Sequence, residues 1–340
     1  MKILRIACGV MAAMIGAGFA SGREIMAFFT RWGRGSWPIL LASAGSAVWM
    51  MDRVMGVPSV RDLLPRGKGA FLGQGILLTL FFCVAGAMAA AAGELAALTV
   101  PLRHARSAGM LLTLALCMAL KGRSLAALKA LGYILLPLIL LAWVLILRLP
   151  AEAAERTAEP GNILLGILPA LCYSAMNVML STGVLCEAGQ MCSDKECTLA
   201  AVGTGCLLMA LLGLGNFALL PHRTALIDAP LPTVMLLRNY GKTGFYLSAA
   251  VLYLAVVSTQ IAVLRGIDAL FPKRLSRRKT EICFLLIAAL SLCGFGGIVG
   301  SAYPLAGGVS LILLLNKQKK NKGGSPLLVL LFDQASRNNS

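Results

Sequence analysis

The sequence predicts an all-helical integral membrane protein, and three observations support this fold class. Of the 340 residues, 58% are hydrophobic and 13% are charged, whereas soluble domains carry about 25% charged residues. Apolar runs of about 20 residues, the length of helix that crosses a bilayer, recur along the chain. The net charge of +17 comes from short basic clusters between these runs, so it predicts membrane topology and not a nucleic-acid-binding face.

Apolar windows divide the chain into ten candidate membrane spans. They cover residues 3–29, 36–51, 70–98, 107–120, 125–147, 162–190, 198–220, 243–271, 282–299 and 303–315. The connection 221–242 is long and is expected to hold a short helix on the surface. If the N-terminus is cytoplasmic, 20 Lys and Arg residues lie on that side of the membrane and 9 on the other. The excess predicts that both termini are cytoplasmic.

The first span contains Ile15-Gly-Ala-Gly-Phe-Ala-Ser-Gly-Arg-Glu-Ile25, in which three glycines fall within seven residues. Glycine costs roughly 1 kcal/mol relative to alanine inside a helix, so we expect the helix to break at mid-membrane. Irregular backbone at that depth must line a cavity or be buried in protein. We therefore predict a substrate-binding segment formed by Gly16, Ala17, Gly18, Phe19, Ala20, Ser21 and Gly22. The N–H groups after Ser21 are expected to attract an anionic group such as a substrate carboxylate.

Two other interpretations of the same segment remain open. Lys2 and Arg5, followed by an apolar stretch and small residues, are also typical of a signal peptide. Gly18 and Gly22 have the G-x-x-x-G spacing of a helix-packing face. The apolar character that resumes after Ser21, and the charges of Arg23 and Glu24, favour the broken helix.

The sixth span also has polar and small residues at its centre, and we predict that it is broken as well. The sixth span comes five spans after the first, an odd number, so the two run in opposite directions, as an inverted repeat requires. The predicted domains are a first five-helix repeat over 1–148, an external loop over 149–160, a second repeat over 161–316 and a basic cytoplasmic tail over 317–340. The opposite wall of the substrate site is predicted to be formed by Tyr173, Ser174, Asn177, Ser181 and Thr182. Asn177 could equally hydrogen-bond a neighbouring helix.

Three carboxylates fall inside predicted spans, namely Glu24, Glu94 and Glu187. An ionised and unpaired carboxylate in hydrocarbon costs several kcal/mol, so each must pair, take up a proton or face water. Each is therefore a candidate for carrying a coupling proton, because burial favours the neutral form. Arg23 and Glu24 are adjacent and cannot pair well on one helix, so Glu94 and Glu187 are candidate partners for Arg23. Arg265 lies near the cytoplasmic end of its span and is expected to extend toward the membrane surface.

The run from Ile15 to Ile25, followed by Phe28 and Phe29, closely resembles the opening of the YkvI-type family of bacterial membrane proteins. That family is placed in the amino acid, polyamine and organocation superfamily, which has the LeuT-like 5+5 fold. The similarity extends to about residue 315, with the first-span motif as its specific part. At Arg23 the chain departs from the family pattern, where an uncharged glutamine is usual. The resemblance implies a multi-pass protein of the bacterial inner membrane.

The resemblance further implies a sodium site between the first-span carbonyls around Ala13 to Gly18, with Ala13 and Gly16 as candidate ligands, and the adjacent hydroxyls of Ser258 and Thr259. Uncharged oxygen ligands suit a monovalent cation that is released in each cycle. In the alternative interpretation, both hydroxyls bond back to the preceding helical turn. The residues leave Na+ and H+ open as the coupling ion, and no other cofactor is expected.

We therefore predict an ion-coupled secondary transporter of a small organic solute, an amino acid or an amine, that works by alternating access. Its expected partners are this solute and membrane lipid, with no nucleic acid. A membrane receptor or sensor that keeps the transporter fold without the transport cycle is the main alternative. An enzyme is not expected, because His104 and His222 lie in predicted outer loops and no catalytic spacing is present.

Overall fold

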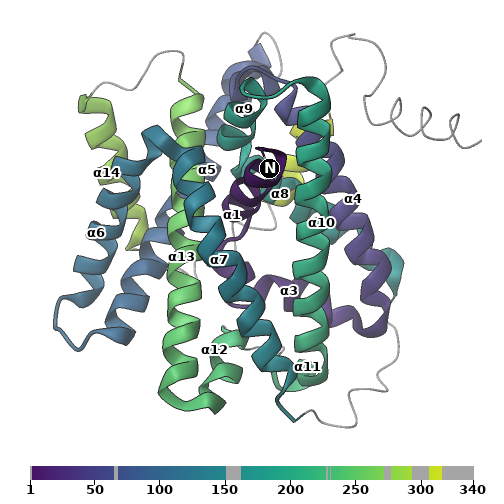
Figure 1. Ribbon diagram of the computed structural model, residues 1–340. Helices are drawn as coiled ribbons and strands as arrows, with labels where there is room; N and C mark the ends of the chain where they lie inside the picture. The colour runs from purple at the N-terminus through teal and green to yellow at the C-terminus, as the bar shows by residue number, and fades with distance from the viewer. Residues whose placement is uncertain are drawn as a thin grey trace, which may run out of the picture.

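The computed structural model describes residues 2–64, 68–150, 162–226, 229, 231–271, 277–292 and 306–315. Within these ranges the regular structure is entirely helical, as the sequence predicts. The helices pack side by side as long rods, with short helices and turns at the two ends of the bundle (Figure 1). The predicted loop 149–160 and tail 317–340 fall almost wholly outside the described residues, as do 293–299 and 303–305 of the last two predicted spans.

The first half of the chain forms five predicted spans and their connections. The first span consists of α1 (Lys2–Met14), α2 (Ala17–Ala20) and α3 (Arg23–Phe28), followed by the 3-10 turn η1 (Thr30–Gly35). The next elements are α4 (Ser36–Met55), η2 (Val60–Leu63), α5 (Lys68–Thr99), α6 (Ala105–Leu120), η3 (Lys121–Arg123) and α7 (Ser124–Leu147).

The second half follows the same order of long elements. The sixth span consists of α8 (Ile163–Leu180) and α9 (Thr182–Gln190), and the seventh is α10 (Asp194–Leu219). After these come η5 (Leu220–His222), α11 (Arg223–Leu226), α12 (Pro232–Leu237), η6 (Arg238–Tyr240), α13 (Gly241–Ala269), α14 (Arg277–Ser291) and the apolar helix Ala306–Leu315.

Five helical stretches in the described part of the chain are long and apolar enough to cross a membrane. They are Ala70–Thr99, Ala105–Leu147, Ile163–Leu180, Asp194–Leu226 and Pro232–Ala269. Ala105–Leu147 is two rods, α6 and α7, that turn at η3 (Figure 1). The first predicted span is not among the five, because its break leaves only short helices.

Helix α1 lies in the interior of the bundle. From Ile6 to Met14 every residue is buried, and the helix packs against α7, α10 and α13. Small side chains make this close packing possible. Ala7, Ala12 and Ala13 are almost fully enclosed, and a Cβ atom on Gly132 of α7 would lie 2.7 Å from the Cys8 carbonyl oxygen. The interrupted segment that follows α1 therefore lies in the protein interior.

A glycine also packs closely against a cysteine in the second half of the chain, as Gly132 packs against Cys8 in the first half. A Cβ atom on Gly307, in the helix Ala306–Leu315, would lie 2.9 Å from Cβ of Cys172 and 3.0 Å from its carbonyl oxygen in α8. In each half, then, a glycine of the last predicted span packs against a cysteine of the first. Likewise α4 packs against α8, while α10, its counterpart in the second half, packs against α1.

Helix α12 differs from the expectation of a short helix lying on the surface. Pro232, Thr233, Val234, Leu236 and Leu237 are all buried. The helix lies at the end of the bundle where α3 and α11 are found (Figure 1), and it packs against α13 and α7. The prediction failed because apolar residues in a polar connection were assigned to the surface, whereas here they cover the interrupted first span.

Candidate functional site

The first span is interrupted where its glycines predict. Helical bonding in α1 ends with the Ile15 N–H donating to the Met11 carbonyl at 3.0 Å. Gly16 is extended, with φ −88° and ψ 176°, and α2 begins at Ala17. The last turn of a helix leaves its carbonyl groups without helical partners. The break therefore leaves the carbonyl oxygens of residues 12–15, including that of Ala13, without helical partners.

Two hydroxyl groups of α13 meet the break. Ser258 Oγ lies 3.4 Å from the Ile15 carbonyl oxygen, and Thr259 Oγ1 lies 3.2 Å from the same atom. Both side chains are buried. Ser258 also bonds back to Ala255 O at 2.9 Å. Its hydroxyl therefore also makes the bond to the preceding helical turn that was the alternative to an ion site. The structure thus brings both predicted hydroxyls to one carbonyl of the predicted segment, that of Ile15. The carbonyls of Gly16, Ala17 and Gly18 accept bonds within the segment itself.

A second irregularity separates α2 from α3. Gly22 has φ +78°, a left-handed conformation that favours glycine. Ser21 Oγ donates to Gly18 O at 3.0 Å and accepts from the Arg23 N–H at 3.3 Å. The Arg23 N–H, one of those expected to attract a substrate carboxylate, is thus already bonded within the segment.

A lid formed by residue 229 and helix α12 covers this second irregularity. The Thr233 N–H donates to Ser21 O at 2.9 Å, and Thr233 Oγ1 donates to Ala20 O at 2.9 Å. Arg23 Nη1 donates to Ala229 O at 3.0 Å. Thr233 was not predicted as a site residue; the only signal was Pro232, which is typical of the first turn of a helix.

Thr233→Val should loosen this lid. The substitution keeps the side-chain volume and the backbone bond to Ser21, but it leaves the buried Ala20 carbonyl without its donor, a loss of about 1–3 kcal/mol. We expect faster amide hydrogen exchange in 229–240 than in the wild type. Thr204→Val is the matched control, because the Thr204 hydroxyl bonds only to Ala200 O within its own helix. Equal exchange of 229–240 in both variants would show that the Thr233 hydroxyl does not hold the lid.

Glu24 lies beside the same segment. Its side chain fills the space beside Gly18, where a Cβ atom would collide with the Glu24 carboxylate. Glu24 is 5% exposed, and its Oε2 atom has no hydrogen-bond partner. Tyr173 of α8 is the hydrogen-bonding partner of the carboxylate. The Tyr173 ring packs against Phe28 and Phe29, with centroids 5.1 and 5.3 Å apart.

The other residues predicted for the opposite wall have different surroundings. A single residue, Ser181, with φ −92° and ψ 0°, interrupts the sixth span between α8 and α9. Its N–H donates to Asn177 O at 3.2 Å, and its carbonyl accepts the N–H groups of Val184 and Leu185. Ser181 Oγ is buried without a partner. Ser174 bonds Ser43 of α4, with the two oxygens 2.7 Å apart. Asn177 bonds back to Tyr173 O of its own helix at 3.0 Å, and Thr182 of α9 donates across the interruption to Met179 O of α8 at 2.7 Å.

The structure does not bring the other two carboxylates to the break. Glu94 pairs with Arg106 at 3.4 Å, and both side chains are largely exposed. Glu187 pairs with Arg265 at 3.0 Å and accepts from Ser124 Oγ at 2.6 Å. Each acid proposed as a partner of Arg23 is therefore occupied elsewhere, and Arg265 is part of an ion pair.

The contacts of Glu187 and Glu196 join helices at the end of the bundle at which α1 begins. The Arg265–Glu187 pair joins α13 to α9, and Lys2 bridges from α1 to Glu196 of α10 at 2.9 Å. Glu196 also completes a capping box with Ser193 at the start of α10. The interrupted segment thus lies between a lid at one end of the bundle and ion pairs at the other.

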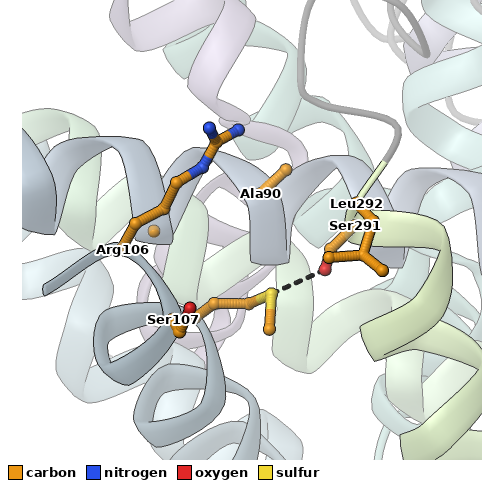
Figure 2. A pocket seen from close by; sticks show the side chains of 7 residues that line it. Ala90, Arg106, Ser107, Ser291 and Leu292 are labelled. Carbon is orange, nitrogen blue, oxygen red and sulfur yellow. Dashed lines mark hydrogen bonds between the residues drawn. The ribbon is translucent and has the colours of Figure 1, made fainter. Parts of the chain in front are cut away.

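A separate pocket of about 220 Å³ lies between α5, α6 and α14. Figure 2 shows its lining side chains, among them Arg106 and Ser291, with Ser291 Oγ bonded to Met110 Sδ at 2.6 Å. None of the predicted site residues lines this pocket. It is therefore a feature of the helix packing on that flank and not part of the interrupted segment.

The apolar rods and the buried polar segment place the chain among the helical, multi-spanning membrane proteins. No family model matches the chain. It is similar to the uncharacterized membrane protein YkvI of Bacillus subtilis (strain 168), with 24% identity over 327 residues that cover 89% of this chain and 92% of that protein. The similarity supports a membrane location and leaves the activity to be inferred from the site.

Proposed function

We propose that the protein is a secondary transporter that carries a small organic solute, an amino acid or an amine, with Na+ as the coupling ion. The observation that carries the proposal is the meeting of the Ile15 carbonyl with Ser258 and Thr259. A broken helix end and two uncharged hydroxyls offer the hard oxygen ligands that a monovalent cation prefers.

A 5+5 inverted repeat is the fold that we propose for this carrier. Its support is the paired packing of the two halves: Gly132 against Cys8, and Gly307 against Cys172. Each pair joins the last span of one half to the first span of the same half. In such folds the substrate and ion sites lie where the two first spans cross, and here that crossing would place α2 and α3 beside Tyr173.

Closure at both ends is also what a carrier needs. The lid bonds of Thr233 hold one end of the interrupted segment, and the ion pairs of Glu187 and Lys2 join helices at the other end of the bundle. We place the protein in the bacterial inner membrane with both termini cytoplasmic, because the excess of basic residues lies on the N-terminal side. The lid would then face outward, and the ion pairs would face the cytoplasm.

Uptake into proteoliposomes tests the proposal. Purified protein is reconstituted and given radiolabelled amino acids and amines, with sodium and pH gradients imposed separately. Accumulation that follows the sodium gradient and is abolished by a sodium ionophore is the expected result. Binding of a solute without flux would favour a sensor over a carrier. Chemical conversion of the solute would favour an enzyme.

A further inference from the structure

Glu24 is the starting point of an inference about the solute. In the part of the chain that the structure describes, it is the only Asp, Glu, Lys or Arg among the buried residues. One carboxylate oxygen has no partner, and none of the four ion pairs between described side chains includes Glu24. A buried acceptor without a donor is costly. A group that brings a donor and a positive charge would remove this cost.

The surroundings of Glu24 restrict the chemistry of that group. The rings of Phe28 and Phe29 pack against the ring of Tyr173, which is the hydrogen-bonding partner of the carboxylate. Aromatic rings attract cations through their faces and exclude water. An anionic group would meet a like charge at Glu24, and a neutral hydroxyl would supply a donor but leave the charge unbalanced.

We propose that Glu24, supported by Tyr173, Phe28 and Phe29, binds the positively charged ammonium group of the transported solute. The solute is therefore an organic amine. The protein recognises its ammonium group and not any carboxylate that it carries. The inference rests on the proposed function, because it assigns the solute class of the same interrupted segment. Gly18 takes part by leaving the space that the Glu24 side chain fills.

Calorimetric titration of the purified full-length protein tests the assignment. The probes are methylammonium, n-butylammonium and the diamine putrescine, with n-butanol and butyrate as neutral and anionic counterparts of similar size. At least one amine should bind, while n-butanol and butyrate should bind at least tenfold more weakly. Absence of amine binding, or equal affinity for n-butylammonium and n-butanol, would overturn the assignment.

Variants then locate the binding group. Glu24→Gln keeps the shape of the side chain and should weaken amine binding by about tenfold or more. Glu94→Gln is the matched control, because Glu94 is an exposed carboxylate that pairs with Arg106, and it should leave the affinity unchanged. Tyr173→Phe removes only the hydroxyl that positions Glu24, so it should reduce the amine affinity by a smaller factor. This variant tests the site independently if Glu24→Gln folds poorly. Amine affinity that survives in both site variants would contradict the proposal.

The uptake assay separates failure of this inference from failure of the proposed function. If a neutral or anionic solute accumulates with the sodium gradient and amines do not compete, the solute assignment fails and the carrier stands. If amines bind through Glu24 but nothing crosses the membrane, the assignment stands and the carrier fails. If Glu24→Gln abolishes proton-driven uptake with unchanged amine affinity, Glu24 is a proton carrier and the assignment fails.

Discussion

Gly183→Ala should destabilise the protein, although alanine is the better helix former. Gly183 lies in α9 against the backbone of α13. A Cβ atom there would lie 2.6 Å from Gly266 N and 2.8 Å from the Arg265 carbonyl carbon. Because backbone atoms cannot rotate away, the two helices must separate, and overpacking of this kind costs about 1–3 kcal/mol. Separation would also stretch the 3.0 Å Arg265–Glu187 pair.

The same substitution at Gly45 is the matched control. Gly45 lies inside α4, and a Cβ atom there would have no neighbouring atom within 4 Å. Replacing this helical glycine should leave the free energy of unfolding unchanged or raise it by up to about 1 kcal/mol. The melting temperature should therefore stay the same or rise. The melting temperature of each variant is measured in detergent, with size-exclusion chromatography after heating to detect the folded protein that remains. Equal melting temperatures for Gly183→Ala and Gly45→Ala would refute the close contact between α9 and α13.

The double variant Ser258→Ala/Thr259→Val should lose sodium binding altogether. Both hydroxyls face the Ile15 carbonyl, and their removal leaves a cation with too few oxygen ligands to replace its water shell. The wild type should bind radioactive sodium in a scintillation proximity assay. Its melting temperature should also be higher in sodium chloride than in choline chloride, because an ion that binds only the folded state stabilises it. Both effects should vanish in the double variant.

Thr79→Val provides the control for this loss. The Thr79 hydroxyl bonds to Gly75 O within α5, so the substitution makes the same chemical change away from the break. It should keep full sodium binding. Sodium binding retained in the double variant, or lost equally in Thr79→Val, would show that Ser258 and Thr259 do not form the ion site.

The sequence predicted those features that depend on local backbone chemistry. Three glycines in seven residues make a helix unfavourable in any context, and the structure interrupts the first span at Ile15 and Gly16 and again at Ser21 and Gly22. The spacing of apolar runs predicted the order of the long helices. The meeting of Ser258 and Thr259 with the break came from the family resemblance, because nothing in the residues alone pairs two segments so far apart in the chain.

The features that the sequence missed depend on tertiary packing. Ser174 and Asn177 have the polar character of site residues, but their hydrogen bonds go to Ser43 and to the Tyr173 carbonyl. The partners of Glu94 and Glu187 lie on other helices, and only the fold selects Arg106 and Arg265 for them. In the sixth span the interruption is confined to Ser181, whereas the first span is interrupted at two places.

Cysteine labelling can show whether the interrupted segment opens alternately to the two sides of the membrane. In a background where the ten native cysteines are replaced by alanine, Ala17→Cys places one thiol on the buried α2 segment. A membrane-impermeant maleimide is applied to oriented vesicles from the outside and, in inverted vesicles, from the cytoplasmic side. A carrier that works by alternating access should be labelled from both sides, and sodium should change the ratio of the two labelling rates. Labelling from one side only, whatever the sodium concentration, would contradict it.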